Sequence, residues 1–386
     1  MESPIVTVAA SSQSPGTMNT RFDAADILRG VAILAVFVYH ATLRAWPWNG
    51  WSRDFHHVSA VTIGTFYPLS FGWSGVALFF VLSGFCIHVS FLRARQFTWP
   101  RFFWQRFWRI YPAYLVALVA FAVCRRLDVA TKAGMKMLLS HVLLIQNLNA
   151  DTFFGINASF WSLGTEMQLY LLFPLLLWLR ERFGILACLG ITFGVGLAWR
   201  LISLLCWGLP DQCINPACTF PLVTWFDWTL GVFVAERVVQ GIPAFSHHLI
   251  WLMALIPAFV LSTLFKPLTT FSFTLAAAIS AVALDRMTRT SLAENIVLKF
   301  LATVGIVSYS GYLWHQPLLE LMPRWLDPHA YLWPRLIAVG TICLLAVLSY
   351  SCLERSGIRF GKWLWNKLKG EPQPQINQAR IENGLS

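Results

Sequence analysis

The chain is dominated by long apolar segments of roughly 17 to 25 residues, the length at which a helix crosses the ~30 Å hydrocarbon core of a bilayer. Ten apolar segments of about this length, from 15 to 27 residues, are found at residues 27–43, 66–92, 110–124, 160–179, 184–207, 220–236, 249–265, 268–284, 300–322 and 331–353. A backbone in lipid must satisfy its own hydrogen bonds, so these segments are expected to be helical. The sequence predicts an all-α membrane protein, a polytopic helical bundle of about ten transmembrane helices.

The composition excludes a water-soluble globule. Only 12% of the residues are charged and 57% are hydrophobic, whereas a soluble domain carries about 25% charged residues. A transmembrane barrel would show alternating segments of about ten residues, and the sequence contains none. One further apolar stretch, residues 137–148, is too short to cross a bilayer. We expect it to form a re-entrant or interfacial helix.

The segments define three regions of the chain. Residues 1–20 are rich in Ser, Thr, Ala and Pro and predict a disordered N-terminal tail. Residues 21–356 hold all ten apolar segments and form the predicted transmembrane domain, followed by a basic and then polar C-terminal tail over 357–386. No cation precedes Arg21 and the first apolar run begins late, so we expect a retained first helix rather than a cleaved signal peptide.

The net charge of +11 is explained by membrane topology. With ten spans and the N-terminus inside, the cytoplasmic segments hold 18 of the 29 Lys and Arg residues. This is the bias expected of a protein that has membrane lipid, and not nucleic acid, as its partner. Both termini are then cytoplasmic, most simply at a bacterial cytoplasmic (inner) membrane.

Four cations after the third span (Arg125, Arg126, Lys132 and Lys136) lie on the predicted outer side, where they either snorkel to the membrane surface or contact an anionic ligand.

Two polar residues interrupt the first apolar segment, "ILRGVAILAVFVYHA". Arg29 and His40 are eleven residues apart, which is about three helical turns plus 20°, so they share one face and lie about 16 Å apart along the axis. Asp26 falls near the same stripe. A cation near the bilayer centre costs about 2.5–3.5 kcal/mol on insertion scales, so it usually faces a cavity or a partner. The simpler alternative is an Asp26–Arg29 cap at the membrane surface, with His40 snorkelling to the other side.

Other spans also carry polar groups. Ser83 lies in a glycine-threaded aromatic span, where helix packing is the simpler explanation. Arg106 and Arg109 share a helix face in a segment of five arginines and no acid; they either anchor the span or grip phosphate groups.

The fourth and ninth spans contain further polar residues. Ser162 and Glu166 lie one turn apart in the fourth, and an intramembrane carboxylate is a functional candidate by default. Tyr312 and His315 accompany two serines in the ninth, where polar contacts between helices are the alternative.

The cysteines and histidines do not predict a metal site. The eight cysteines are scattered, with no C-x-x-C motif and no histidine at zinc-ligand spacing. We therefore expect neither a metal nor a bound cofactor. Cys213 and Cys218 share a predicted outer loop, where an oxidising compartment would permit a disulfide; free thiols are an equally good interpretation.

Five of these segments, in order, resemble the acyltransferase 3 family of integral-membrane acyltransferases. The segments are "RGVAILAVFVYH" (29–40), "SGFCIHVS" (83–90), "RFWR" (106–109), "WSLGTEMQLYLLFP" (161–174) and "SYSGYLWHQPL" (308–318). Ala25 departs from the family's frequent Leu before the Asp. The chain ends soon after the tenth span, without room for the esterase-like domain fused to some relatives. We therefore expect transfer directly to the acceptor or to a separate partner protein.

The resemblance implies O-acylation of sugars, commonly O-acetylation in polysaccharide modification. The donor implied by the resemblance is cytoplasmic acyl-CoA, commonly acetyl-CoA, and the implied acceptor is a hydroxyl of a glycan or other sugar-containing molecule. On this hypothesis Arg29, Arg106 and Arg109 bind the CoA phosphates. His40 acts as the base or as an acyl carrier, with Glu166 or His315 orienting it. Asp26, Ser83, Ser162, Tyr312 and His315 support the site.

Two other classes of protein share some of these features. A transporter or flippase of a glycan or lipid-linked intermediate would also place Arg, His and Glu inside spans, but would be expected to show a repeated half with broken helices. A membrane scaffold would not need a cation and a histidine aligned on one face. Trp46, Trp48 and Trp51 in the first outer loop would either stack on sugar rings or anchor the loop at the interface.

Overall fold

The computed structural model describes residues 20–42, 58–210, 214–290, 295–326 and 333–369, which are helical throughout apart from short connections. The predicted all-α fold is confirmed. The predicted tail over 1–20, the tryptophans of the first outer loop and Cys213 fall in segments that lie wholly or almost wholly outside the described residues.

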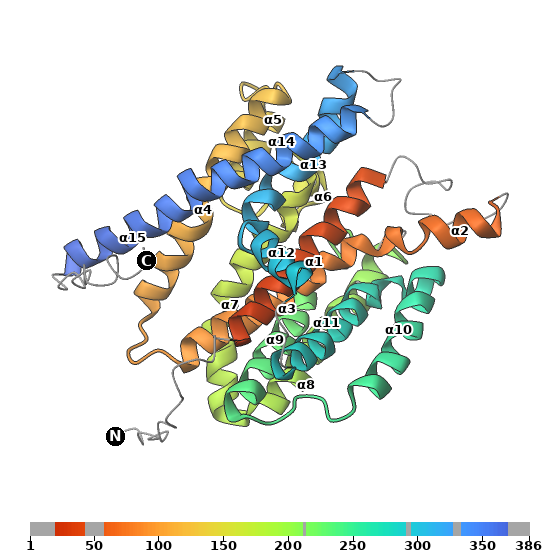
Figure 1. Cartoon of the computed structure of the whole chain (residues 1–386), viewed down its shortest axis with the longest axis vertical. Coiled ribbons are helices and arrows are strands. Elements are labelled where there is room, and N and C mark those ends of the chain that lie inside the picture. Colours follow the sequence, from red (N-terminus) through yellow and green to blue (C-terminus); the bar gives the residue numbers. More distant parts are fainter. Residues whose placement is uncertain (1–19, 43–57, 211–213, 291–294, 327–332, 370–386) are drawn as a thin grey trace.

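Figure 1 shows the order of the helices along the chain. They are α1 (Thr20–Thr42), α2 (Ala60–Phe66), η2 (Leu69–Ser74), α3 (Gly75–Leu92), α4 (Trp99–Cys124), α5 (Lys132–Val142), η3 (Gln146–Leu148), α6 (Ala150–Phe153), η4 (Ala158–Phe160), α7 (Trp161–Phe183), α8 (Ile185–Trp207), α9 (Pro221–Gln240), α10 (His248–Leu264), η5 (Lys266–Phe271), α11 (Ser272–Arg289), α12 (Ile296–Ile306), α13 (Ser308–Leu326), α14 (Trp333–Ser349), the π-helical turn η6 (Tyr350–Glu354) and α15 (Arg355–Lys369).

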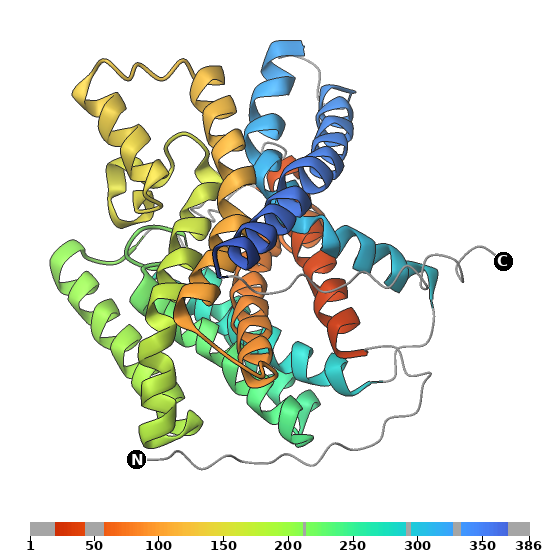
Figure 2. The same ribbon diagram turned by 90° about the vertical axis from the view of Figure 1, so that its left-hand side faces the viewer.

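The number of membrane-crossing helices differs from the predicted ten. Within the described ranges, seven helices are long and apolar enough to cross a bilayer. An eighth span results if α12 and α13, which are bent by 75° at their junction, cross as one unit (Figure 2). The predicted segments 220–236 and 249–265 correspond to α9 and α10. Helix α10 has only 17 residues, and α9 carries charged residues that lower its mean hydropathy. A count of ten is therefore not confirmed.

Helix α9 is enclosed by other helices, and the partners of Glu236 explain how one of its two acidic groups is accommodated. Asp227 and Glu236 are both buried. Glu236 accepts a hydrogen bond from His88 of α3 at 2.8 Å and pairs with Arg180 of α7. Carboxylates in a bundle interior persist when such partners compensate them. These contacts tie three helices together beneath the site described below.

Close packing of α3 on α9 depends on two glycines. A Cβ atom added to Gly84 would collide with the backbone carbonyl of Trp228, and one added to Gly231 would collide with that of Val81. Small residues let helix backbones approach closely where lipid provides no hydrophobic drive. This confirms the packing interpretation of the glycine-threaded third helix at Gly84.

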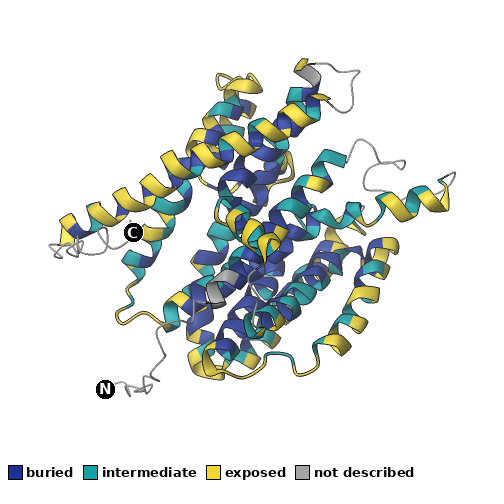
Figure 3. Ribbon diagram, viewed as in Figure 1, coloured by how far each residue is buried: buried dark blue, intermediate teal, exposed yellow. Residues whose placement is uncertain are grey.

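The outer helices have exposed faces (Figure 3), and many of the exposed residues are large and apolar. Leu186, Leu201 and Leu205 of α8 and Leu249 and Met253 of α10 are more than half exposed. Apolar side chains over whole outward faces are typical of helices in contact with lipid. Buried side chains are most frequent in α3 and α9, and α1 packs against η2, α3, α11, α12 and α13.

The last helix continues beyond the predicted end of the transmembrane domain. Helices α14 and α15, joined by η6, form one continuous rod that packs against α4 (Figure 1). Residue 356 therefore lies within a helix, and the domain boundary there stays a prediction. Single π turns inside α-helices are frequent at functional sites. Here the turn ends on Glu354, which is buried.

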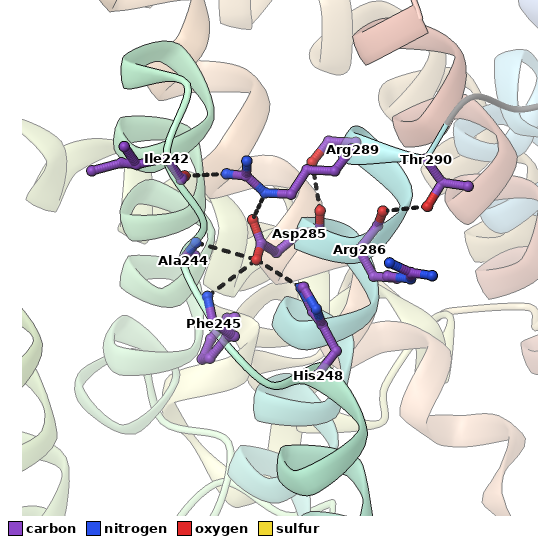
Figure 4. Close-up of polar contacts among 9 residues, drawn as sticks. Ile242, Ala244, Phe245, His248, Asp285, Arg286, Arg289 and Thr290 are labelled. Carbon is purple, nitrogen blue, oxygen red and sulfur yellow. Dashed lines mark hydrogen bonds and ion pairs between the residues drawn. The ribbon is translucent and has the colours of Figure 1, made fainter.

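A fully buried aspartate fixes the connection between α9 and α10 (Figure 4). Asp285 of α11 accepts hydrogen bonds from the backbone amides of Ala244 and Phe245 at 3.2 and 3.1 Å. It also pairs with His248 and Arg289, each at 2.9 Å. Three donors converge on Oδ2 and Arg289 binds Oδ1, so the carboxylate is held by partners of the protein and this cluster is structural.

The predicted outer cations find partners in the protein. Arg125 pairs with Glu320 of α13 at 3.0 Å, and Lys136 of α5 pairs with Asp151 of α6 at 2.8 Å. The short apolar stretch at 137–148 contains the end of α5 and η3, and α5 is not among the helices long enough to cross a bilayer. Within the described residues, these pairs account for two of the four cations without an anionic ligand.

Candidate active site

A cavity of about 300 Å³ lies between α1, α3, α4, α7, α13 and the π turn η6. Eight of the ten predicted site residues line it: Asp26, Arg29, Ser83, Arg106, Arg109, Ser162, Glu166 and Tyr312. They come from five helices that are distant in sequence. The cavity has the size and mixed polarity of a small-molecule site. We call it the arginine cavity.

Arg29 is held in the arginine cavity by two contacts. Its Nη1 donates to Oδ1 of Asp26 at 2.5 Å, and its Nη2 donates to Sγ of Cys86 at 3.1 Å. The Asp26–Arg29 pair considered as a surface cap is therefore present, but both residues also line the cavity. The pairing lowers the cost of placing the cation inside the bundle.

Glu166 is oriented by hydroxyl groups from two helices. It accepts hydrogen bonds from Ser83 of α3, at 2.8 Å, and from Tyr170, one turn further along α7. Trp228 donates to Ser83 at 3.3 Å and holds that hydroxyl in place. The hydrogen bonds of Glu166 therefore lie on the side of the arginines. The expectation that Glu166 orients His40 gains no support from this geometry.

Arg106 and Arg109 enter the cavity from α4. The guanidinium of Arg106 lies over the rings of Phe102 and Tyr170, at 5.6 and 5.9 Å from their centroids. Its Nε atom is buried and has no hydrogen-bond acceptor among the described residues. A guanidinium positioned by aromatic rings and left with an unused donor is suited to bind a phosphate or carboxylate.

Two residues of the arginine cavity were missed in the sequence. Tyr170 lies four residues after Glu166 and so shares its helix face, a spacing that could have identified it. Glu354 accepts a hydrogen bond from Ser310 at 3.0 Å and lines the same cavity. In the sequence, Glu354 is recognisable only as a carboxylate directly after the last apolar run. At that position a solvated helix end is the simpler expectation.

His40 and His315 form a pair beside the arginine cavity rather than in its described lining. Their rings meet edge to face with centroids 4.9 Å apart. Nδ1 of His40 lies 2.9 Å from the carbonyl oxygen of Val36, and Nδ1 of His315 lies 2.7 Å from that of Tyr312. A carbonyl oxygen only accepts, so each Nδ1 carries the proton. In a neutral ring this leaves Nε2 free to act as an acceptor.

A chain of hydroxyl groups joins the histidine pair to the arginine cavity. Nε2 of His315 lies 3.4 Å from Oγ of Ser159. Tyr312, whose ring lies 5.1 Å from that of His315, shares a hydrogen bond of 2.8 Å with Ser162. Ser162 and Tyr312 line the cavity, whereas His315 contacts His40. The predicted site is therefore divided, with Arg29 in the cavity and His40 about 16 Å further along α1.

No group of three or more His, Cys, Asp or Glu side chains in the described part of the chain is arranged to hold a metal ion. The charged groups of the site are instead three arginines facing carboxylates that are themselves hydrogen bonded. Such an arrangement can bind an anionic molecule and place a histidine base nearby.

Comparison with known proteins decides the family. The model of the acyltransferase 3 family, described as an acyltransferase domain, matches residues 22–353. The chain belongs to this family. The match covers every residue of the arginine cavity except Glu354 and Ile358, and it covers both histidines.

Three proteins with similar sequences have names that describe acyl transfer. BcsY of Komagataeibacter xylinus, whose name describes a membrane-bound transacylase, is 26% identical over 358 residues, covering 87% of this chain and 82% of BcsY. The peptidoglycan O-acetyltransferase OatA of Listeria monocytogenes is 25% identical over 85% of this chain. The acyltransferase MdmB of Streptomyces mycarofaciens is 28% identical over 56% of this chain.

These matches differ in how much of each relative they span. The chain covers only 54% of the length of OatA and 57% of that of MdmB. No solved structure matches the chain significantly. The acyltransferase 3 membership, with the many long apolar helices, identifies a multi-pass membrane acyltransferase.

Proposed function

We propose that this acyltransferase moves an acyl group, acetyl in the simplest case, from acyl-CoA to a hydroxyl of a glycan or other sugar-containing acceptor. The observation that supports this most strongly is the arginine cavity, joined through Ser162 and Tyr312 to the His40–His315 pair. Acyl-CoA is a substrate in this proposal, and no bound cofactor or metal is required. A transporter is not favoured, because the chain belongs to an acyltransferase family.

In this proposal the arginines bind the donor. Acyl-CoA carries several phosphate charges, and guanidinium groups grip phosphate oxygens bidentately. Arg106 offers a buried donor without a partner, and Arg29 and Arg109 line the same cavity. Glu166 and Asp26 balance these cations when the cavity is empty and orient their side chains. Glu166 would thus serve catalysis by arranging the donor side of the site rather than by contacting His40.

His40 acts as the general base. Its Nδ1 proton is committed to the carbonyl of Val36, so Nε2 accepts the proton of the acceptor hydroxyl. The acceptor oxygen attacks the thioester carbonyl carbon, the C–S bond breaks, and the proton on His40 passes to the leaving thiolate. The products are an ester and free CoA. A covalent acyl-histidine would give the same products in two steps.

His315 holds His40 in place. Its ring meets that of His40 edge to face, and it is itself held by the carbonyl of Tyr312 and stacked on Phe37 at 5.3 Å. A second group that orients the base is a recurring arrangement in acyl transfer. Ser83, Ser162 and Tyr312 complete the support of the site through the hydrogen bonds described above.

The acceptor is inferred from chemistry and relatives. The name of OatA specifies peptidoglycan O-acetylation, and a hydroxyl-bearing glycan fits a histidine base. We place the protein in a bacterial cytoplasmic membrane with both termini inside, so that the arginines face the cytoplasmic supply of acyl-CoA and His40 lies toward the outer side.

A transfer assay tests this function. Membranes from cells expressing the wild-type protein, the His40→Ala variant or an empty vector are incubated with acetyl-CoA labelled in the acetyl group. Label is expected in the glycan fraction only with the wild type, and mass spectrometry of surface glycans then identifies the acceptor. Equal labelling by wild-type and empty-vector membranes would contradict the proposal.

A further inference from the structure

A second cavity, of about 580 Å³, opens where α3 ends and α4 begins. Its walls come from the last turn of α3, the connection over residues 93–98 and the first two turns of α4. It shares two lining residues, Ile87 and Arg106, with the arginine cavity. The two cavities therefore meet at Arg106. We call the second one the hairpin cavity.

The hairpin cavity is cationic. Arg95, Arg101 and Arg106 line it, and no carboxylate does. None of these three arginines forms an ion pair with a carboxylate within the described ranges, in contrast to Arg29, Arg125, Arg180 and Arg289. Three uncompensated guanidinium groups around one cavity favour a ligand with more than one negative charge.

The hairpin cavity also has aromatic walls. The rings of Phe91 and Phe97 meet edge to face at 5.0 Å, and Phe102 lies 5.8 Å from Phe97. Phe91 and Phe97 are partly exposed, and His88 stacks on Phe91 with ring centroids 5.7 Å apart. Polar side chains from Ser90, Gln96 and Gln105 complete the lining. Aromatic faces beside arginines and amide groups match a nucleobase attached to phosphates.

We propose that the hairpin cavity binds the nucleotide end of acyl-CoA, an inference that rests on the proposed function. The adenine base lies against Phe91 and Phe97, and Arg95 and Arg101 bind the 3′-phosphate. Arg106, shared by both cavities, binds the pyrophosphate together with Arg29 and Arg109 of the arginine cavity. The thioester arm then continues into the arginine cavity toward Tyr312 and the histidine pair.

The spacing of the arginines along α4 supports a single ligand that spans both cavities. Arg101 and Arg109 are eight residues apart on α4, which is about 12 Å along the helix axis. A molecule that contacts both ends of this row must be extended and must carry anions at more than one point. A free phosphate would occupy only one end, and a lipid headgroup would leave the aromatic walls and the shared residue Arg106 unused.

Binding measurements on the whole protein in a neutral detergent test this subsite. The probes are CoA, dephospho-CoA (which lacks the 3′-phosphate) and acetyl-pantetheine (which lacks the nucleotide). Arg95→Gln and Arg101→Gln should each weaken CoA binding about tenfold, and the double variant about a hundredfold. For dephospho-CoA the loss should be much smaller, and acetyl-pantetheine should bind all variants equally.

The matched control removes the same charge elsewhere. Arg182 and Arg286 are exposed and lie on the same predicted side, outside both cavities, so Arg182→Gln with Arg286→Gln should leave CoA binding unchanged. An Arg95/Arg101 double variant that binds CoA like the wild type would overturn the subsite alone. Failure of the wild type to bind CoA would overturn the donor assignment as well.

Anionic lipid is distinguished by a second arm of the experiment. Activity of the double variant is compared in nanodiscs of phosphatidylcholine and in nanodiscs containing phosphatidylglycerol. The proposal expects the same fractional loss in both, because the arginines bind the donor. A loss that appears only with phosphatidylglycerol, with CoA affinity unchanged, would assign the hairpin cavity to lipid headgroups instead.

Discussion

The imidazole rings of His40 and His315 meet edge to face, with centroids 4.9 Å apart, although one comes from α1 and the other from α13. Each ring is fixed through its Nδ1 atom by a backbone carbonyl one helical turn earlier. Burying two ionisable side chains inside a membrane bundle is costly, and such residues commonly have a function. In our account one is the base and the other positions it.

Replacement of His315 should separate positioning from packing. His315→Ala should lower kcat by at least about tenfold, since the base loses its orienting partner, while the affinity for acyl-CoA stays unchanged. His315→Phe retains a ring of similar size but has no nitrogen atoms. If the nitrogens matter, the Phe variant remains as slow as the Ala variant. Recovery of wild-type kcat and of the wild-type pH profile in His315→Phe would show that His315 only fills space.

The arginine cavity should govern donor affinity. Arg106→Gln with Arg109→Gln removes two guanidinium groups, and each lost charge-assisted hydrogen bond contributes about 1.5–3 kcal/mol. Losing two such bonds should therefore raise the Kd for acyl-CoA at least about a hundredfold. The protein should still reach the membrane in normal amounts. Arg182→Gln with Arg286→Gln is the matched control. Unchanged donor affinity in the Arg106/Arg109 variant would assign these residues to membrane anchoring.

The short helix α5 carries a buried histidine that should make stability depend on pH. Burial lowers the pKa of His141 from 6.5 to about 4, whereas the unfolded chain titrates near 6.5. The unfolded state therefore binds the proton first. Stability is fully present above pH 6.5 and is lost as the pH falls toward 4, by up to about 3 kcal/mol.

Thermal unfolding in detergent at pH 7.5 and pH 5 tests the role of His141. The wild-type Tm should fall at pH 5, and His141→Gln should show a smaller fall. His247→Gln, which replaces an exposed histidine, should behave like the wild type. An identical pH dependence in the wild type and His141→Gln would contradict the assignment.

The topology can be tested directly. If α9, α10 and the bent pair α12–α13 all cross the membrane, a fusion after Leu209 lies outside and one after Ser386 lies inside. Alkaline phosphatase should then be active at Leu209 and green fluorescent protein should fluoresce at Ser386. A fusion after Gln96, in the predicted cytoplasmic connection between α3 and α4, is the control. The same side for Leu209 and Ser386 would exclude a ten-span arrangement.

Much of the architecture follows from the sequence because lipid imposes helices on long apolar runs. Residues of the arginine cavity could also be predicted from the sequence, because charged residues such as Arg29, Glu166 and Arg106 are costly in a membrane span and are therefore functional candidates. These residues converge in one cavity, which favours a binding role over the alternatives of helix packing and membrane anchoring. Packing or anchoring alone does not require residues from separate helices to face one space.

Other features depend on tertiary structure and could not be read from local patterns. The bend between α12 and α13 interrupts a continuous apolar run without a proline at Val307. Glu354 follows the end of an apolar run, so its burial depends on the π turn and on the continuation into α15. The pairing of His40 with His315, rather than with Glu166, is decided by how α1 packs on α13.

The central claim is that His40 acts on the acceptor's proton and not on the donor's phosphates. The most direct test measures acetyl transfer and acetyl-CoA binding side by side for the wild type and His40→Ala at matched protein levels. We predict that His40→Ala loses about 10²- to 10⁴-fold in transfer rate and keeps its acetyl-CoA affinity within about twofold. Wild-type turnover by His40→Ala, or a loss explained entirely by weaker acetyl-CoA binding, would contradict the account.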